Sequence, residues 1–198
     1  MKSDVCKIEN GTLDLGLILK ESEKVAVYNK LNEKQTNQLR LICEELDGML
    51  PNIINDFSGD FWIDFEEGVC KANAEITIAD FSADAKSELI KVSKNNKNAF
   101  ATGLVGKIRS IIEDLFLDSK TYKSYDMSML FSSAIEYSVG LEESAYRWSL
   151  NKYRKAISEE NAPEWDELEK SIIASLADDI IIGVKGKKAS IVVVKKFN

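Results

Sequence analysis

The strongest constraint on the fold is a change in the spacing of apolar residues after residue 54. Between residues 36 and 54 they recur three and four positions apart, which places them on one face of a helix. They are Leu39, Ile42, Cys43, Leu46, Met49, Leu50, Ile53 and Ile54. From residue 61 the spacing becomes two, which predicts a strand hairpin over 61–79 that turns at Glu66–Gly68. A helix with one buried face, followed by half-buried strands, predicts helices packed on a sheet.

Both kinds of pattern continue along the chain. Asn10-Gly11 marks a turn between two short strands, and the polar run 94–98 predicts a loop. Further helices are predicted over 84–92, from 104 to about 115, in two parts of 127–157, and from Pro163 to about Ala177. β-Branched residues at 180–184 and 190–194 predict a closing hairpin around Gly186-Lys187.

The order of these elements predicts one α+β domain over residues 1–198. We expect a two-layer α/β sandwich, in which helices cover one face of a mostly antiparallel mixed sheet. An inserted helical segment occupies residues 119–177. The helices at 36–54 and 103–117 should lie side by side on that face, and the two hairpins should belong to the same sheet.

The amino-acid composition limits the reactions and partners that we expect for this chain. The chain has no histidine, so it has no imidazole for acid–base catalysis, for a Ser-His or Cys-His nucleophile pair or for metal binding. Its net charge of -7 disfavours nucleic acid and anionic membrane as partners. Cys6, Cys43 and Cys70 are odd in number and widely spaced, which indicates neither a zinc cluster nor a disulfide framework. With no signal-like or membrane-spanning apolar run, we expect a cytoplasmic protein.

Four segments in their order resemble a known superfamily. They are LRLICEELDGMLPNI, FWIDFEEGVCKANAEITIAD, TGLVGKIRSIIEDL and DDIIIGVKGKKASIVVVKKF, namely a helix, a hairpin, a glycine-opened helix and a closing hairpin. This layout resembles the GHKL superfamily of histidine-kinase-like ATPases, in particular the bacterial anti-sigma regulatory kinases. The resemblance covers about residues 30–118 and 178–197 and leaves 119–177 as an insertion.

The resemblance implies a catalytic glutamate on the first helix, with a Mg²⁺-binding asparagine four residues later. Glu45 stands at the glutamate position, but Met49 stands where the asparagine belongs. Counting from Glu44 instead leads to Gly48. The resemblance therefore implies a general base in this chain but no metal ligand.

The resemblance also implies a nucleotide, ATP or ADP, without a firmly held Mg²⁺. The family has an aspartate that hydrogen-bonds the adenine, two glycines that follow it, and a second glycine motif that opens a helix against the phosphates. The corresponding nucleotide residues here are Asp80, Lys97, Asn98, Gly103 and Gly106. Ser82 and Asp84 replace the two glycines after the aspartate, and Asp84 adds negative charge near the phosphates.

Each of these features also has a purely structural interpretation. The Glu44-Glu45 pair is typical of a solvated helix edge. Asp80 serves equally well as the N-cap of a following helix. Gly103 and Gly106 allow close helix packing, although a helix N-terminus flanked by lysines also suits an anion.

We therefore expect a degenerate histidine-kinase-like domain of bacterial regulatory type, with weak or lost nucleotide binding. It would act by protein contact, with a partner protein or as a homo-oligomer, and the 119–177 insertion would be the recognition surface. The alternative is an active ATP-dependent protein kinase or ATPase with a diverged pocket. That enzyme would use Glu45 as base and Asp80 for adenine.

Overall fold

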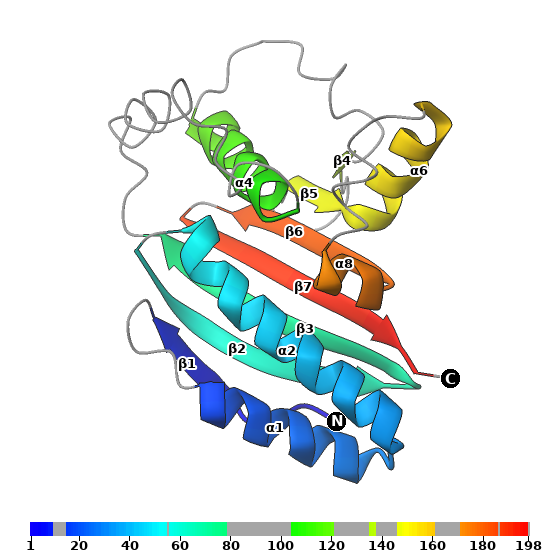
Figure 1. Ribbon diagram of the computed structural model, residues 1–198. Coiled ribbons are helices and arrows are strands. Elements are labelled where there is room, and N and C mark those ends of the chain that lie inside the picture. The colour runs from blue at the N-terminus through cyan, green and yellow to red at the C-terminus, as the bar shows by residue number, and fades with distance from the viewer. Residues whose placement is uncertain are drawn as a thin grey trace.

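Figure 1 shows the computed structural model of the chain. The structure describes residues 1–9, 15–54, 56–78, 104–120, 135–137, 146–160, 171–185 and 187–197. Several predicted features lie outside these residues. They are the helix at 84–92, the loop at 94–98, and the nucleotide residues Asp80, Lys97, Asn98 and Gly103.

Within the described residues, seven strands form one sheet in the order β1-β2-β3-β7-β6-β5-β4, and every neighbouring pair is antiparallel. The strands are β1 Cys6–Glu9, β2 Phe57–Glu66, β3 Val69–Ile78, β4 Ile135–Tyr137, β5 Tyr146–Ser149, β6 Asp179–Lys185 and β7 Lys188–Lys196. The two predicted hairpins, β2-β3 and β6-β7, meet at the centre of this sheet, where β3 pairs with β7. Their expected membership of one sheet is confirmed.

The helices cover one face of the sheet (Figure 1). They are α1 Leu15–Tyr28, α2 Glu33–Ile53, α4 Leu104–Lys120, α6 Leu150–Glu160 and α8 Ile172–Leu176. The predicted helix pair corresponds to α2 and α4, which contact each other on this face. The protein is thus an α+β two-layer sandwich with an antiparallel sheet, as its sequence predicts.

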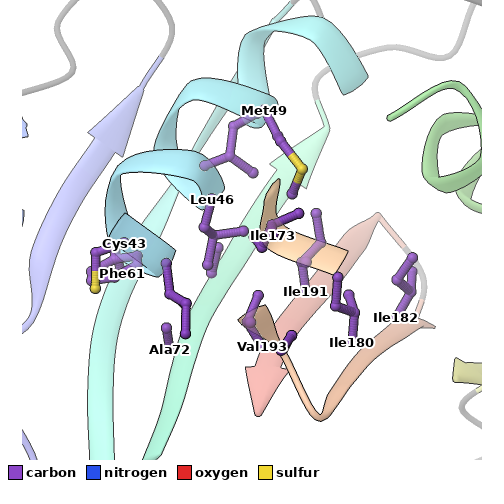
Figure 2. Packing of buried hydrophobic residues seen from close by; sticks show 14 of the residues in the cluster. Cys43, Leu46, Met49, Phe61, Ala72, Ile173, Ile180, Ile182, Ile191 and Val193 are labelled. Atoms are coloured by element: carbon purple, nitrogen blue, oxygen red, sulfur yellow. The ribbon is translucent and has the colours of Figure 1, made fainter. Parts of the chain in front are cut away.

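The core lies between the two layers and follows the alternation of the strands. Phe61 and Ile63 of β2 are fully buried toward the helices, while Trp62 between them faces the other side. The central strands contribute Ala72, Ile191 and Val193 to the same layer (Figure 2). Residues two apart share one face of a strand, so a single row per strand meets the apolar face of α2.

Two parts of the fold differ from the sequence predictions. Residues 127–157 were expected as two helices. Residues 150–157 are helical as part of α6, but β4 and β5 lie before them and extend the sheet beyond β6. Each of these strands is four residues long or shorter, too short to show an alternating pattern. The second short strand expected after Asn10-Gly11 is replaced by α1, whose buried face includes the polar residues Glu21 and Ser22.

Local hydrogen bonds explain the polar positions of α1. Ser22 Oγ donates to the Leu19 carbonyl at 2.7 Å, and Glu21 Oε2 accepts from the Asp4 backbone N–H at 3.1 Å. A buried polar side chain is tolerated when it is hydrogen-bonded in this way. Within the described residues, the helices are each too short or too polar to cross a membrane.

Candidate functional site

The candidate site centres on one side of α2, and the start of this helix sets which side chains face inward. Asn32 Oδ1 accepts from the Gln35 backbone N–H at 3.0 Å, and Gln35 Oε1 accepts from the Asn32 N–H at 3.0 Å. This capping box satisfies two N–H groups that the first turn leaves unpaired. From that start the helix buries Met49 and leaves Glu45 half-buried at the border of the apolar stripe.

The two adjacent glutamates of α2 have different surroundings. Glu44 accepts a hydrogen bond from Arg40 Nε at 3.0 Å, in an ion pair between residues one turn apart. Glu45 has no hydrogen bond or ion pair within the part of the chain that the structure describes. Residues four apart share a helix side, so Glu45 lies beside Met49, and Glu44 lies beside the exposed Gly48. Glu44 therefore fits the solvated-edge interpretation.

Met49 stands where the resemblance implies a metal-binding asparagine. Its side chain is only 5% exposed, and Figure 2 shows it pointing toward Ile173 of α8. Ile191 and Ile182 of the central strands, both fully buried, belong to the same apolar cluster. A thioether among aliphatic side chains supplies no oxygen ligand of the kind that Mg²⁺ requires.

The short helix α8 contacts α2, and residues outside α8 form hydrogen bonds at both of its ends. At its start, Ser171 Oγ accepts from the Ala174 backbone N–H at 3.4 Å. At its end, the Arg154 guanidinium of α6 donates to the carbonyl oxygens of Ala174 and Ala177. These bonds satisfy groups that a helix end leaves unpaired. The inserted segment thus supplies Ile173 to the candidate site and fixes its position.

The first turn of α4 holds Gly106, the one implied nucleotide residue within the described part of the chain, and it is half-buried. The next residue, Lys107, places its Nζ 4.9 Å from the centre of the Tyr153 ring. Tyr153 packs in turn against the fully buried Trp148, with ring centres 5.6 Å apart. A cation over an aromatic face is attracted by the electrons of the ring. Lys107 therefore contributes to the packing of α4 on α6.

Asp47 is a buried carboxyl on α2 that the sequence analysis did not single out. It is only 6% exposed, and its Oδ1 has no hydrogen-bond partner. Burial raises the pKa of Asp47, because desolvation penalises the charged carboxylate. The signal was present in the sequence, since Asp47 lies four residues after Cys43 and three before Leu50, both in the apolar stripe.

Asp47 and Met49 do not belong to the same cluster of side chains. Residues two apart on a helix point about 160° away from each other, so the two side chains lie on opposite borders of the buried face. Asp47 lies on the Cys43 side, and its charge is one cause of the raised pKa of the Cys43 thiol, after burial and other charges. In Figure 2, Cys43 lies beside Phe61, away from Ile173.

A hollow of about 420 Å³ runs along the outer side of α2. It is bordered by Glu33, Lys34, Asn37, Gln38 and Leu41. These residues occupy the first half of the helix, so this hollow is distinct from the surroundings of Met49. Among the described residues, no group of three or more cysteine and carboxylate side chains is arranged to hold a metal ion.

No family model, curated protein or solved structure matches this chain. A functional proposal for it therefore rests on the sequence pattern, the fold and the geometry around α2.

Proposed function

We propose that this chain is a histidine-kinase-like domain that has lost phosphoryl transfer and regulates another protein by binding it. The arrangement of α2 and α4 on one face of a sheet supports this proposal, as does the central position of the β2-β3 and β6-β7 hairpins. This is the arrangement that the resemblance of the sequence implies.

The observation that carries the loss of catalysis is the burial of Met49 against Ile173. Phosphoryl transfer relies on metal ions that bridge the phosphates and neutralise the developing charge. Met49 provides no metal ligand, and the apolar side chains around it would have to move before hydrated Mg²⁺ could approach. Burial of charge against such side chains without polar partners is costly. The free-energy cost of bringing Mg²⁺ to this place argues against phosphoryl transfer, and we therefore favour protein binding.

A protein partner in a reducing compartment agrees with the remaining chemistry. The net charge of -7 repels nucleic acids and anionic membranes. Cys6, Cys43 and Cys70 are all buried, and none of the three forms a disulfide. Cysteines without disulfides are typical of the cytoplasm, where thiols are kept reduced.

The second candidate function is an active ATPase or protein kinase, and one observation favours it. Glu45 is half-buried beside Met49 and has no hydrogen bond or ion pair within the described residues. A carboxylate in such a position is suited to act as a general base, because its oxygens are not engaged by another described side chain and can accept a proton from a substrate. Asp80 would then contact the adenine.

Thermal unfolding of the full chain with millimolar ATP or ADP and Mg²⁺ separates these functions. A ligand at a hundred times its dissociation constant stabilises a protein by about 2.7 kcal/mol, which is easily measured. We expect no shift in the melting temperature and no release of phosphate. A shift that Asp80→Asn abolishes, together with turnover that Glu45→Gln abolishes, would establish the enzyme and overturn the proposal.

A further inference from the structure

The helix α1 carries an exposed stripe of side chains opposite the side chains that it buries. At about 100° per residue, the members of this α1 stripe lie within about 100° of one another around the helix axis. They are Leu17, Lys20, Lys24, Val27 and Tyr28. The exposed fractions of Val27 and Tyr28 are 79% and 71%, and that of Leu17 is 50%. Exposed apolar side chains that gather in this way are typical of an interaction site.

The charge that remains uncompensated on the α1 stripe is positive. The two acids of α1 are both ion-paired, Glu21 with Lys24 and Glu23 with Arg40. The side chain of Lys20 has no hydrogen bond or ion pair within the described residues. Although the chain as a whole carries -7, this stripe therefore attracts acidic groups.

A second exposed lysine follows the stripe in a strained backbone conformation. Lys30 has a φ of 55°, in the left-handed region that favours glycine. Its N–H donates to the Val27 carbonyl at 3.1 Å, and the Leu31 N–H donates to the Ala26 carbonyl at 3.0 Å. These bonds define the helix ending in which glycine is the usual residue at this position. The Lys30 side chain has no hydrogen bond or ion pair in the described part of the chain, so strain is tolerated here for a charge that the fold itself does not use.

The spacing of the α1 stripe fits another helix. Positions 17, 20, 24 and 27 are three and four residues apart, which is the spacing of the seam along which two helices pack. At 1.5 Å per residue, Leu17 and Val27 are about 15 Å apart along the axis, so a partner helix would contact about three turns. A second copy of the chain would bring two positively charged stripes together, and like charges repel. An acidic helix of another protein matches both the apolar and the charged positions.

We infer that the α1 stripe and Lys30 bind an amphipathic helix of a partner protein. The apolar side of that helix packs on Leu17, Val27 and Tyr28, and its carboxylates pair with Lys20 and Lys30. The inference rests on the proposed function only for the existence of a protein partner. It does not depend on the loss of phosphoryl transfer, because α1 and α8 lie on opposite sides of α2 (Figure 1).

The first test selects helical peptides on the immobilised full chain from a phage-displayed library. Each peptide has an apolar stripe, with glutamate, lysine or glutamine chosen at random at the flanking positions. We expect the selected peptides to be rich in glutamate and to bind Val27→Asp at least about tenfold more weakly than the wild type. Ile172→Asp is the matched control, because Ile172 is 49% exposed on α8, and it should leave the affinity unchanged. Selection of lysine-rich peptides, or of none that Val27→Asp weakens, overturns the inference.

The second test reverses one charge of the stripe. Lys20→Glu should weaken binding of a selected peptide about tenfold, and replacement of the glutamates of the peptide by lysine should restore it. Lys71→Glu is the control, because Lys71 of β3 is also exposed without an ion pair among the described residues, and it should have no effect. Equal binding of the acidic and the basic peptide to Lys20→Glu overturns the inference.

Lys30→Gly separates binding from folding. Glycine relieves the left-handed conformation, so this variant should melt about 2–4 °C higher than the wild type. It should also bind the selected peptide about threefold more weakly, as loss of an exposed ion pair does. A higher melting temperature with unchanged affinity would show that Lys30 takes no part in binding and would overturn its place in the inference.

Two further measurements examine other occupants of the α1 stripe. Light scattering gives the mass of the full chain, and flotation with anionic vesicles measures membrane binding. A dimer that Val27→Asp dissociates, or vesicle binding that it abolishes, would place a second copy or a membrane on the stripe and overturn the inference. Nucleotide binding would overturn the proposed loss of catalysis and leave this inference standing. Circular dichroism confirms that each variant is folded.

Discussion

Met49 on α2 points toward Ile173 on α8, in the apolar cluster that also includes the central strands (Figure 2). The two residues are far apart in the chain, because Met49 belongs to α2 and Ile173 belongs to the segment between α4 and β6. The inserted segment is therefore part of the core beside α2.

This contact should be measurable as a coupling between the two side chains. Met49→Ala and Ile173→Ala should each lower the free energy of unfolding by about 2–5 kcal/mol, because each leaves a cavity in the core. In a double-mutant cycle, residues in contact couple by about 0.5–3 kcal/mol. Urea denaturation measures the free energy of unfolding of the wild type, the two single variants and the double variant. Ile172→Ala, at the exposed neighbouring position, should cost about 0.5 kcal/mol or less. Strict additivity of the two core changes would contradict the contact.

Asp47 should make stability fall as pH rises. Burial raises its pKa above the ordinary value of 3.8, so the native state keeps the proton to higher pH than the unfolded chain does. This contribution is fully favourable below pH 3.8 and is lost as pH rises to the native pKa. Asp47→Asn should remove this dependence and raise the melting temperature at neutral pH by about 2–4 °C, as about 1 kcal/mol would in a chain of this size.

The control for Asp47 is Asp56→Asn, because Asp56 is exposed at the start of β2. We expect this variant to melt within about 1 °C of the wild type at every pH, as surface changes usually do. If the melting temperatures of the two variants depended on pH in the same way, the burial of Asp47 would have no effect on stability.

Replacement of two glycines by alanine should change the stability of the protein in opposite directions. A Cβ at Gly59 in β2 would lie 2.1 Å from the Glu75 backbone oxygen and 2.9 Å from the Ile76 Cα, so the paired strands would have to separate. Gly59→Ala should therefore destabilise the protein by about 2 kcal/mol or more. Gly48 in α2 has nothing within 4 Å of an added Cβ, and Gly48→Ala should stabilise it by about 0.5–1 kcal/mol. Chemical denaturation compares both with the wild type.

The three cysteines should be inert in the native protein. Burial raises the pKa of Cys70 to about 12 and the pKa of Cys43 well above its usual range, and the thiolate is the reactive form. A thiol-specific reagent should therefore label the native chain only slowly and label three thiols after denaturation. Lys71→Cys, at the exposed position next to Cys70, is the control and should react at once. Rapid labelling of Cys43 or Cys70 in the native protein would contradict their burial.

Local patterns predicted the parts of the fold that depend on neighbours in sequence. The apolar stripe of α2 and the β2-β3 hairpin follow from spacings of three to four and of two. β5 was not predicted, because four residues are too few to show the two-residue alternation of a strand. For the candidate site, the sequence predicted Glu45 as the base and Met49 at the position of the metal ligand. It could not predict the surroundings of these residues, because the Arg40–Glu44 ion pair and the burial of Met49 depend on how α2 packs.

The sequence by itself determined that α2 and α4 are helices with one buried face, where the two central hairpins lie, and that the fold is of the α+β class. Local spacing suffices for these features because backbone geometry repeats every two or 3.6 residues. Only the tertiary structure decided that Ile173 packs on Met49, that Asp47 is buried with no hydrogen-bond partner for its Oδ1, and that α1 carries exposed apolar side chains. These features arise from contacts between residues far apart in the chain, which no local spacing encodes.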